Sequence, residues 1–277
     1  NNKLIISSEI KGILKIDKNL KKINKDVLEY YLTSSSYDTI GETFFKDINQ
    51  LKPSHYMIYS LADNKLEKFR YWNLKETLNQ NKGDDFLMSE LHELVQNSFK
   101  LQTRTDTELG INVSGGIDSK LMMLTLNNLN NGQKKIKASS YYFDEENYSE
   151  HINTETFSKK INWKVNFLKI TPEDIINNFD EVYDYQDEPF PGIPTICKDL
   201  LLKKSYDDEY KVILEGQGGD DFGAGYLYFF PFYIKSLIKK FKYIDVFKEI
   251  INFKSKENMN IYNFLKFYLS SINSFKG

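Results

Sequence analysis

The alternation of helix-like and strand-like segments after Phe86 constrains the fold of this chain more than any other feature. The segments 108–113, 136–143, 164–170 and 211–216 have the composition of strands, and apolar residues at helical spacing fill the stretches between them. No hairpin signal joins these strands, so each must return through a helix and run parallel to a neighbour. The pattern predicts an α/β domain with a parallel sheet and helices on both faces.

The residues before this domain predict a different order of secondary-structure elements. We expect a strand at 3–10, a helix at 25–35, and a hairpin of 55–61 and 64–72 that turns at Asp63 and Asn64. The polar stretch 73–85, with Gly83 near its end, reads as a linker. We therefore predict an α+β part at 1–72, a linker at 73–85 and the α/β domain at 86–277.

The first motif with chemical content is "VSGGIDSK", Val113 to Lys120, which joins a predicted strand to a predicted helix. Backbone N–H groups at such a glycine turn, together with the helix N-terminus, form an anion-binding concavity. Ser114 and Ser119 add hydroxyl donors. Asp118 would repel a bare phosphate, so its presence indicates a divalent cation between carboxylate and phosphate. A tight helix start without a ligand is the alternative interpretation.

The second motif, "EGQGGDDFGAGY", holds five of the 14 glycines of the chain and also follows a predicted strand. In parallel sheets ligands bind beyond the carboxyl ends of the strands. Asp118 and Asp220 could therefore share one Mg²⁺, which takes one or two carboxylates plus phosphate oxygens. On this interpretation the glycines admit a nucleotide and the aspartate holds its metal.

The composition of the chain limits the classes of molecule that it is expected to bind. With 37 basic and 39 acidic residues the net charge is −2, which sets up no broad field for nucleic acid or an anionic membrane. The single Cys197 fits a reducing compartment, and no signal peptide or membrane-length apolar run is visible. We expect a cytoplasmic protein with small-molecule partners, no nucleic acid and no membrane.

The motifs in their order resemble a known family. S-G-G-x-D-S is typical of the PP-loop ATP pyrophosphatases, which have an adenine nucleotide hydrolase-like fold. "VSGGIDS", "QDEPF" and "LEGQGGDDFGAGY" together resemble the synthetase domain of glutamine-dependent asparagine synthetases. "ISSEIKGIL", "TFFKDINQLKPSHYMIY" and "YWNL" look like the final third of a class II, N-terminal-nucleophile glutamine amidotransferase domain.

The resemblance implies an enzyme that adenylates a carboxylate such as aspartate with MgATP and then amidates it with glutamine-derived ammonia. Asp118, Gln217 and Asp220 would be the catalytic residues, and Asp118 and Asp220 would ligate Mg²⁺. A homodimer is one assembly that the resemblance allows. The residues that would bind ATP are Asn112, Val113, Ser114, Gly115, Gly116, Asp118, Ser119, Tyr141, Glu215 and Gly216.

The chain also departs from the family. Gln217 stands where asparagine synthetases proper carry a glutamate, so the substrate acid can differ. The glutaminase cysteine and a later catalytic lysine would lie outside residues 1–277, so we expect a truncated synthase domain and an inactive fragment. Relatives that amidate sugar acids, close β-lactams or cyclise peptides stay open. Other PP-loop synthetases (for tRNA-lysidine, GMP or NAD) share the first motif but not the second motif or the amidotransferase tail. A degenerate nucleotide-binding module is a further alternative, against which the intact Asp118 and Asp220 argue.

Overall fold

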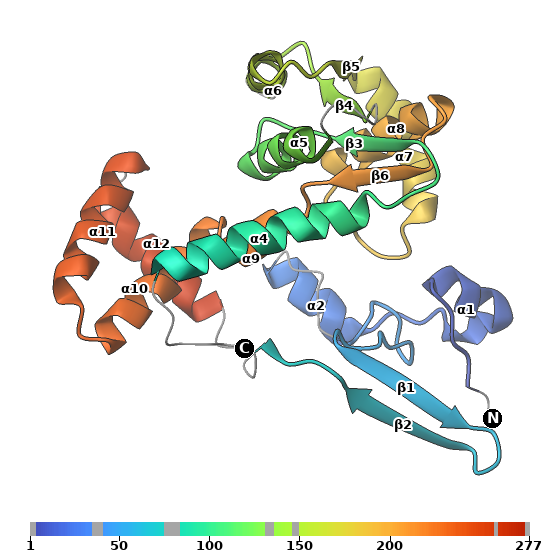
Figure 1. Ribbon diagram of the computed structural model, residues 1–277. Helices are drawn as coiled ribbons and strands as arrows, with labels where there is room; N and C mark the ends of the chain where they lie inside the picture. The colour runs from blue at the N-terminus through green and yellow to red at the C-terminus, as the bar shows by residue number, and fades with distance from the viewer. Residues whose placement is uncertain are drawn as a thin grey trace. The chain divides into compact units, whose positions relative to one another are not determined.

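A computed structural model describes residues 4–34, 41–74, 84–130, 136–145, 150–257 and 260–274 (Figure 1). The chain divides into two compact units. The first unit comprises residues 1–115 and 120–214, and the second comprises residues 116–119 and 215–277.

The N-terminal part of the first unit contains α1 (Ile10–Ile16), η1 (Lys18–Leu20), α2 (Lys25–Ser34) and an antiparallel pair, β1 (His55–Ser60) and β2 (Lys65–Arg70). The predicted hairpin is confirmed, with Asn64 at a φ of 50° in its turn. The hydroxyl of Tyr59 donates to the side-chain oxygen of Asn64 at 2.9 Å. The predicted strand at 3–10 is wrong, because residues 4–7 form no strand and a helix begins at Ile10.

The predicted parallel sheet is confirmed. Its strands are β3 (Leu109–Asn112), β4 (Lys137–Tyr142), β5 (Val165–Lys169) and β6 (Val212–Glu215), in the order β5-β4-β3-β6. Gly110 pairs with Lys137, and Ala138 pairs with Val165. Since β3 and β6 are neighbours in a parallel sheet, their carboxyl ends lie at the same edge.

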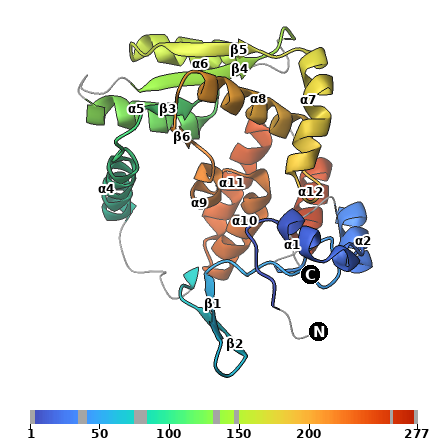
Figure 2. The same cartoon turned by 90° about the vertical axis from the view of Figure 1, so that its right-hand side faces the viewer.

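Helices cover both faces of this sheet (Figure 2). α5 (Ile117–Asn130) and α6 (His151–Lys160) lie on one face, and α7 (Pro172–Tyr185) and α8 (Ile193–Asp207) lie on the other. α4 (Asp84–Gln102) precedes the sheet. Residues 75–83 of the predicted linker lie outside the described residues, so the domain boundaries at 72 and 86 stay a prediction.

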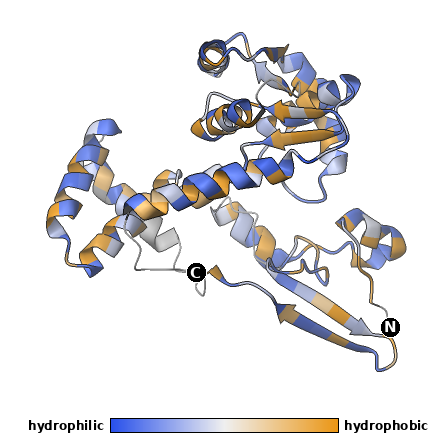
Figure 3. Cartoon of the chain, in the orientation of Figure 1, coloured by the Kyte–Doolittle hydropathy of each residue, from blue (hydrophilic) through white to orange (hydrophobic). Residues whose placement is uncertain are grey.

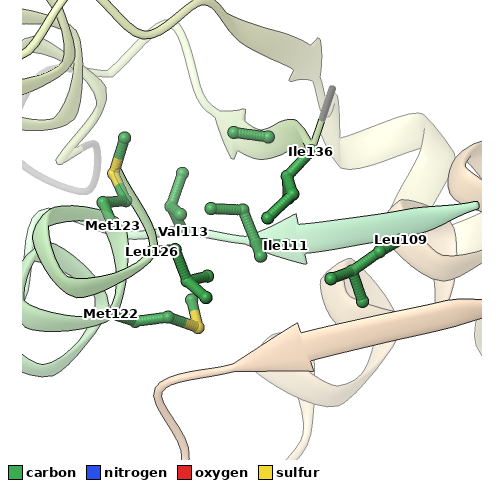
Figure 4. Close-up of a cluster of buried hydrophobic side chains, with 8 residues drawn as sticks. Leu109, Ile111, Val113, Met122, Met123, Leu126 and Ile136 are labelled. Atoms are coloured by element: carbon green, nitrogen blue, oxygen red, sulfur yellow. The ribbon is translucent and has the colours of Figure 1, made fainter. Parts of the chain in front are cut away.

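The core of the sheet lies under α5. Met122, Met123 and Leu126 of this helix are almost fully buried against Ile111 and Val113 of the β3 segment (Figure 4). Figure 3 shows that hydrophobic residues are concentrated along β3 and β6. Burial of such side chains contributes roughly 1.5–3 kcal/mol each. This packing fixes the start of α5, where the first motif lies.

The second unit is helical. Its elements are α9 (Gly219–Gly223), η3 (Leu227–Phe229), α10 (Phe230–Lys239), α11 (Tyr243–Lys256) and α12 (Ile261–Ser274). The rings of Phe230 and Phe253 stack at 4.0 Å, and Phe264 meets both edge-on. Among the described helices of the chain, none has the length and apolar character that crossing a bilayer requires.

Candidate functional site

The two predicted motifs begin where two neighbouring strands end. The loop 113–116 joins β3 to α5, and Gly216 follows β6 directly. Asp118 lies in the first turn of α5, and Asp220 lies in the first turn of the short helix α9. The predicted placement of both motifs at strand ends is therefore confirmed.

Asp118 is packed against two glycines of the second motif. A methyl group placed on Gly216 would lie 3.2 Å from the Cβ of Asp118 and 2.9 Å from the backbone nitrogen of Ser119. A methyl group on Gly219 would lie 2.5 Å from Oδ2 and 2.6 Å from Oδ1 of Asp118, inside contact distance. Glycine is thus required at both positions to leave room for the backbone and the carboxylate at the start of α5.

Asp220 has a glycine neighbour of the same kind. A methyl group on Gly225 would lie 2.8 Å from the Cγ of Asp220 and would overlap its Oδ1. Gly218 has a different reason to be glycine, because its φ is 90° and nothing lies near it. Three of the five glycines therefore accommodate the two aspartates, and a fourth makes the turn. This is a more specific role than the predicted admission of a nucleotide.

The two carboxylates interact electrostatically. Burial raises the pKa of Asp118, the negative charge of Asp220 raises it further, and the backbone N–H of Asp220 partly offsets both effects. Asp118 is half-buried and Asp220 is exposed. Bringing two acids of like charge together costs free energy, which is typical of a site that a cation will neutralise.

Tyr226 also lies near these acids, and the sequence analysis gave it no role. Its pKa is raised first by Asp221, then by burial, and then by the charges of Asp220, Tyr228 and Asp118. Its ring stacks on that of Tyr228 with centroids 5.2 Å apart and an interplanar angle of 11°. The only signal in the sequence was its position at the end of the glycine-rich motif.

A second group of predicted site residues lies in the first unit. Asn112 and Val113 are buried where β3 ends, and the backbone N–H of Val113 donates to the carbonyl of Ser139 at 2.9 Å. Tyr141 is half-buried at the end of β4. Burial raises the pKa of its hydroxyl, and the Cys197 thiol and the Glu150 carboxylate raise it further.

Glu150 is the residue of this second group that the sequence analysis did not identify. A methyl group on Gly115 would lie 2.8 Å from the Cβ and 2.9 Å from Oε2 of Glu150. The glycine at position 115 is therefore needed for the close approach of the residue that precedes α6. The sequence gives no direct signal for this contact, because the helix α5 and the strand β4 separate Glu150 from Gly115 in the chain.

The remaining predicted residues have separate surroundings. Ser119 is buried, and its hydroxyl donates to the carbonyl of Gly116 at 3.1 Å. Ser114 and Gln217 are exposed, and Glu215 is half-buried at the end of β6. Their predicted roles in binding ATP or substrate stay predictions.

The donor set at Asp118 and Asp220 fits Mg²⁺. Both residues offer hard oxygen ligands, and the backbone N–H of Asp220 donates to the Asp118 carboxylate, so the two acids are neighbours. In the described part of the chain, no three His, Cys, Asp or Glu side chains form a closed metal cluster. Two carboxylates with the other positions left to water and phosphate are what Mg²⁺ usually takes from a protein.

Comparison with known proteins identifies the family of the chain. Residues 90–270 match the asparagine synthase family, and residues 1–72 match the glutamine amidotransferase domain. The chain belongs to the asparagine synthase family, preceded by part of a glutamine amidotransferase domain. The resemblance found in the sequence is thereby confirmed.

Individual relatives are distant. A protein of Methanocaldococcus jannaschii, provisionally named glutamine-hydrolysing asparagine synthetase 2, is 27% identical over 247 residues, which cover 86% of this chain and 46% of the relative. The amidase chyE of Penicillium rubens is 22% identical over 241 residues, which cover 81% of this chain and 35% of that protein. The chain thus spans less than half the length of these two relatives.

One solved structure among those matched is the NH3-dependent NAD synthetase from Campylobacter jejuni. It is 13% identical, and the match covers 48% of this chain and 56% of that one with a TM-score of 0.31. The family assignment rests on the sequence matches and not on this likeness.

Proposed function

We propose that the full-length protein amidates a carboxylic acid in two steps. The acid attacks the α-phosphate of ATP to give an acyl-adenylate and pyrophosphate, and ammonia derived from glutamine then displaces AMP. The observation that carries this proposal is the pair Asp118 and Asp220, which is packed against Gly216, Gly219 and Gly225. Membership of the asparagine synthase family supports it.

Asp118 and Asp220 would hold Mg²⁺ between them and the phosphates. The ion would supply charge neutralisation on the pyrophosphate as it leaves. The backbone N–H groups of residues 114–116 and the hydroxyls of Ser114 and Ser119 would bind the same leaving group. Donors fixed before the reaction stabilise developing charge without reorganisation. Because these donors would bind the β- and γ-phosphates, the α-phosphate is left for attack.

Adenosine would lie beside the ends of β3, β4 and β6. Buried Asn112 and Val113 offer a rigid main chain, and half-buried Tyr141 offers a ring. The resemblance gives the same role to Glu215 and Gly216, which directly follow Leu214 in the chain. The position of Gly216, where a side chain would press on Asp118 and Ser119, supports a close approach of backbone at this point.

The acid that is amidated is the open part of the proposal. Aspartate is the first candidate, since one relative is provisionally named an asparagine synthetase. A second candidate is a larger acid, because another relative is named an amidase and because Gln217 replaces a carboxylate that the resemblance places beside the substrate. In both cases the adenylation chemistry is the same.

The nucleotide product tests the proposal. The full-length protein is incubated with MgATP, ammonium and either aspartate or a panel of sugar uronic acids and peptides, and the nucleotides are separated by chromatography. We expect AMP and pyrophosphate in equal amounts. Asp118→Ala serves as the matched inactive control. ADP and phosphate as the main products would overturn the proposed chemistry.

A further inference from the structure

One long-range contact in the first unit joins α1 to the loop that follows α7. The Asp187 carboxylate accepts the backbone N–H of Ile10 at 2.7 Å and that of Lys11 at 3.2 Å. Glu9, at the N-cap position of α1, makes no side-chain capping bond. Two of the orphan N–H groups of this helix are therefore satisfied by a residue 177 positions away from Ile10.

The contact is reciprocal. The ammonium of Lys11 donates to the carbonyls of Asp184 at 3.2 Å and Tyr185 at 2.9 Å, which are the last residues of α7. A carboxylate at a helix N-terminus and a cation at a helix C-terminus are both favourable. Lys11 of α1 thus stabilises the end of α7, and Asp187 in the loop after α7 stabilises the start of α1.

Glu188 makes a second attachment next to the first. Its Oε1 accepts the backbone N–H of Phe44 at 2.6 Å. Burial raises the pKa of Glu188, and the charge of Asp187 raises it too, while the N–H of Phe44 lowers it. The ring of Phe44 also makes an edge-on contact with the ring of Tyr31, with centroids 5.5 Å apart.

Beside these bonds lies a cavity of about 590 Å³. The residues 7–10 and 48–51 line one side, and residues 185–191, which contain both carboxylates, line the other. The loop "QDEPFP" thus faces the residues that match the glutamine amidotransferase domain.

We propose that Asp187 and Glu188 are positioning residues that fasten the amidotransferase part of the chain to the synthase domain, so that ammonia from glutamine reaches the acyl-adenylate. This proposal rests on the proposed function. It assigns to the two adjacent acids a task that neither adenylation nor glutamine hydrolysis alone requires. Free ammonia would bypass them.

The contact is tested first by residue-resolved hydrogen exchange on the chain of 277 residues. This measurement does not depend on enzymatic activity. In Asp187→Ala the amides of Ile10 and Lys11 exchange faster by at least about tenfold, because a charge-assisted hydrogen bond is lost. In Glu188→Ala the amide of Phe44 exchanges faster by the same factor, because its acceptor is removed. Asp187→Asn, which keeps one acceptor oxygen, restores part of the protection.

Asp184→Ala is the matched control. It removes an acid three positions earlier, whose side chain is not the acceptor of these bonds, and leaves the three amides unchanged. Exchange in Asp187→Ala equal to that in Asp184→Ala would overturn the contact. Thermal unfolding of all variants separates a local change from loss of the fold.

The coupling is tested on the full-length enzyme through two rates. With glutamine as nitrogen source, Asp187→Ala releases several glutamates for each AMP, whereas the wild type releases about one. With ammonium as the nitrogen source, Asp187→Ala and the wild type form AMP at the same rate. A wild-type ratio in Asp187→Ala would overturn the coupling role. Absence of AMP from the wild type with either source would instead overturn the proposed function and the coupling role that rests on it, while the exchange result still decides the contact.

Discussion

The carboxylate of Asp118 occupies the space that a side chain at Gly219 would need. A methyl group there would lie 2.5 Å from Oδ2 of Asp118, and Gly219 itself is buried. The same helix α9 contains Gly223, where an added methyl group would meet nothing within 4 Å. The two glycines therefore form a matched pair.

We expect Gly219→Ala to weaken MgATP binding by about tenfold or more, because it displaces Asp118 and Mg²⁺ demands near-ideal ligand geometry. Gly223→Ala leaves the affinity unchanged and stabilises the fold by roughly 0.5–1 kcal/mol, as replacement of a helical glycine usually does. Titration calorimetry and urea unfolding measure the two quantities. Equal affinities in the two variants would show that Asp118 does not contact the bound nucleotide complex.

Asp118→Ala and Asp220→Ala should each nearly abolish MgATP binding, since each removes a carboxylate ligand of the proposed metal. The expected loss is specific to the metal complex, so the weak binding of ATP in the presence of a chelator changes little. Asp221→Ala, one position further on, is the control and retains most of the affinity. Calorimetric affinities for MgATP that stay at the wild-type value in both variants would eliminate the shared-metal hypothesis.

The cap of α7 gives a prediction about stability. The hydroxyl of Thr171 accepts the backbone N–H of Asp174 at 3.2 Å, and Oδ2 of Asp174 accepts the backbone N–H of Thr171 at 2.8 Å. Replacement of an N-cap threonine by alanine costs about 0.5–2 kcal/mol. We expect Thr171→Ala to lower the free energy of unfolding in urea by that amount at pH 7, and Glu173→Gln in the same turn to change it much less. An equal effect of both variants would mean that the capping bonds contribute nothing.

The same cap predicts a pH dependence. The side chain and the backbone of Thr171 lower the pKa of Asp174 below its ordinary value of 3.8. An acid whose pKa is lowered in the folded state stabilises the fold above its unfolded pKa, and this contribution is lost as the pH falls through the folded pKa. The difference between wild type and Asp174→Asn should therefore be constant at neutral pH and shrink as the pH falls through the lowered pKa of Asp174. A difference that persists below this pKa would assign the effect to packing.

The contrast between α7 and α1 shows what the sequence could predict. Thr171 and Pro172 mark the start of α7 locally, since the N-cap and the proline of the first turn stand next to each other in the sequence. α1 was missed because its capping group, Asp187, comes from a distant loop, so its own residues show only the apolar run that suggested a strand. Secondary-structure propensity depends on residues that are close in the sequence, and tertiary contacts can override it.

The residues of the candidate site also divide into those that the sequence could predict and those that it could not. Asp118 and Asp220 were predictable because each follows a strand of one parallel sheet, and such strands end at one edge. Glu150 and Tyr226 were not assigned, because their nearness to Gly115 and to the acids depends on how the connecting segments fold back. Topology can be read from a pattern, whereas side-chain packing cannot.

Gln217 carries the last prediction, which concerns substrate choice. It is exposed in the turn after β6, next to Gly218 with its φ of 90°. The resemblance places a glutamate at this position in asparagine synthetases proper. A carboxylate that faces a substrate ammonium contributes a charge-assisted hydrogen bond of roughly 1.5–3 kcal/mol. A neutral amide should therefore weaken capture of free aspartate by about one to two powers of ten.

We expect the full-length enzyme to prefer an acid without an ammonium group near its carboxylate, and Gln217→Glu to improve kcat/KM for aspartate by about tenfold or more. Pyrophosphate release is measured with aspartate, sugar uronic acids and peptides for wild type, Gln217→Glu and Gln217→Ala. If Gln217 only orders the turn, Gln217→Ala lowers the rates with all acids by the same factor. If the wild type already uses aspartate best and Gln217→Glu brings no gain, the amide does not select the substrate and the ammonium is bound by another group.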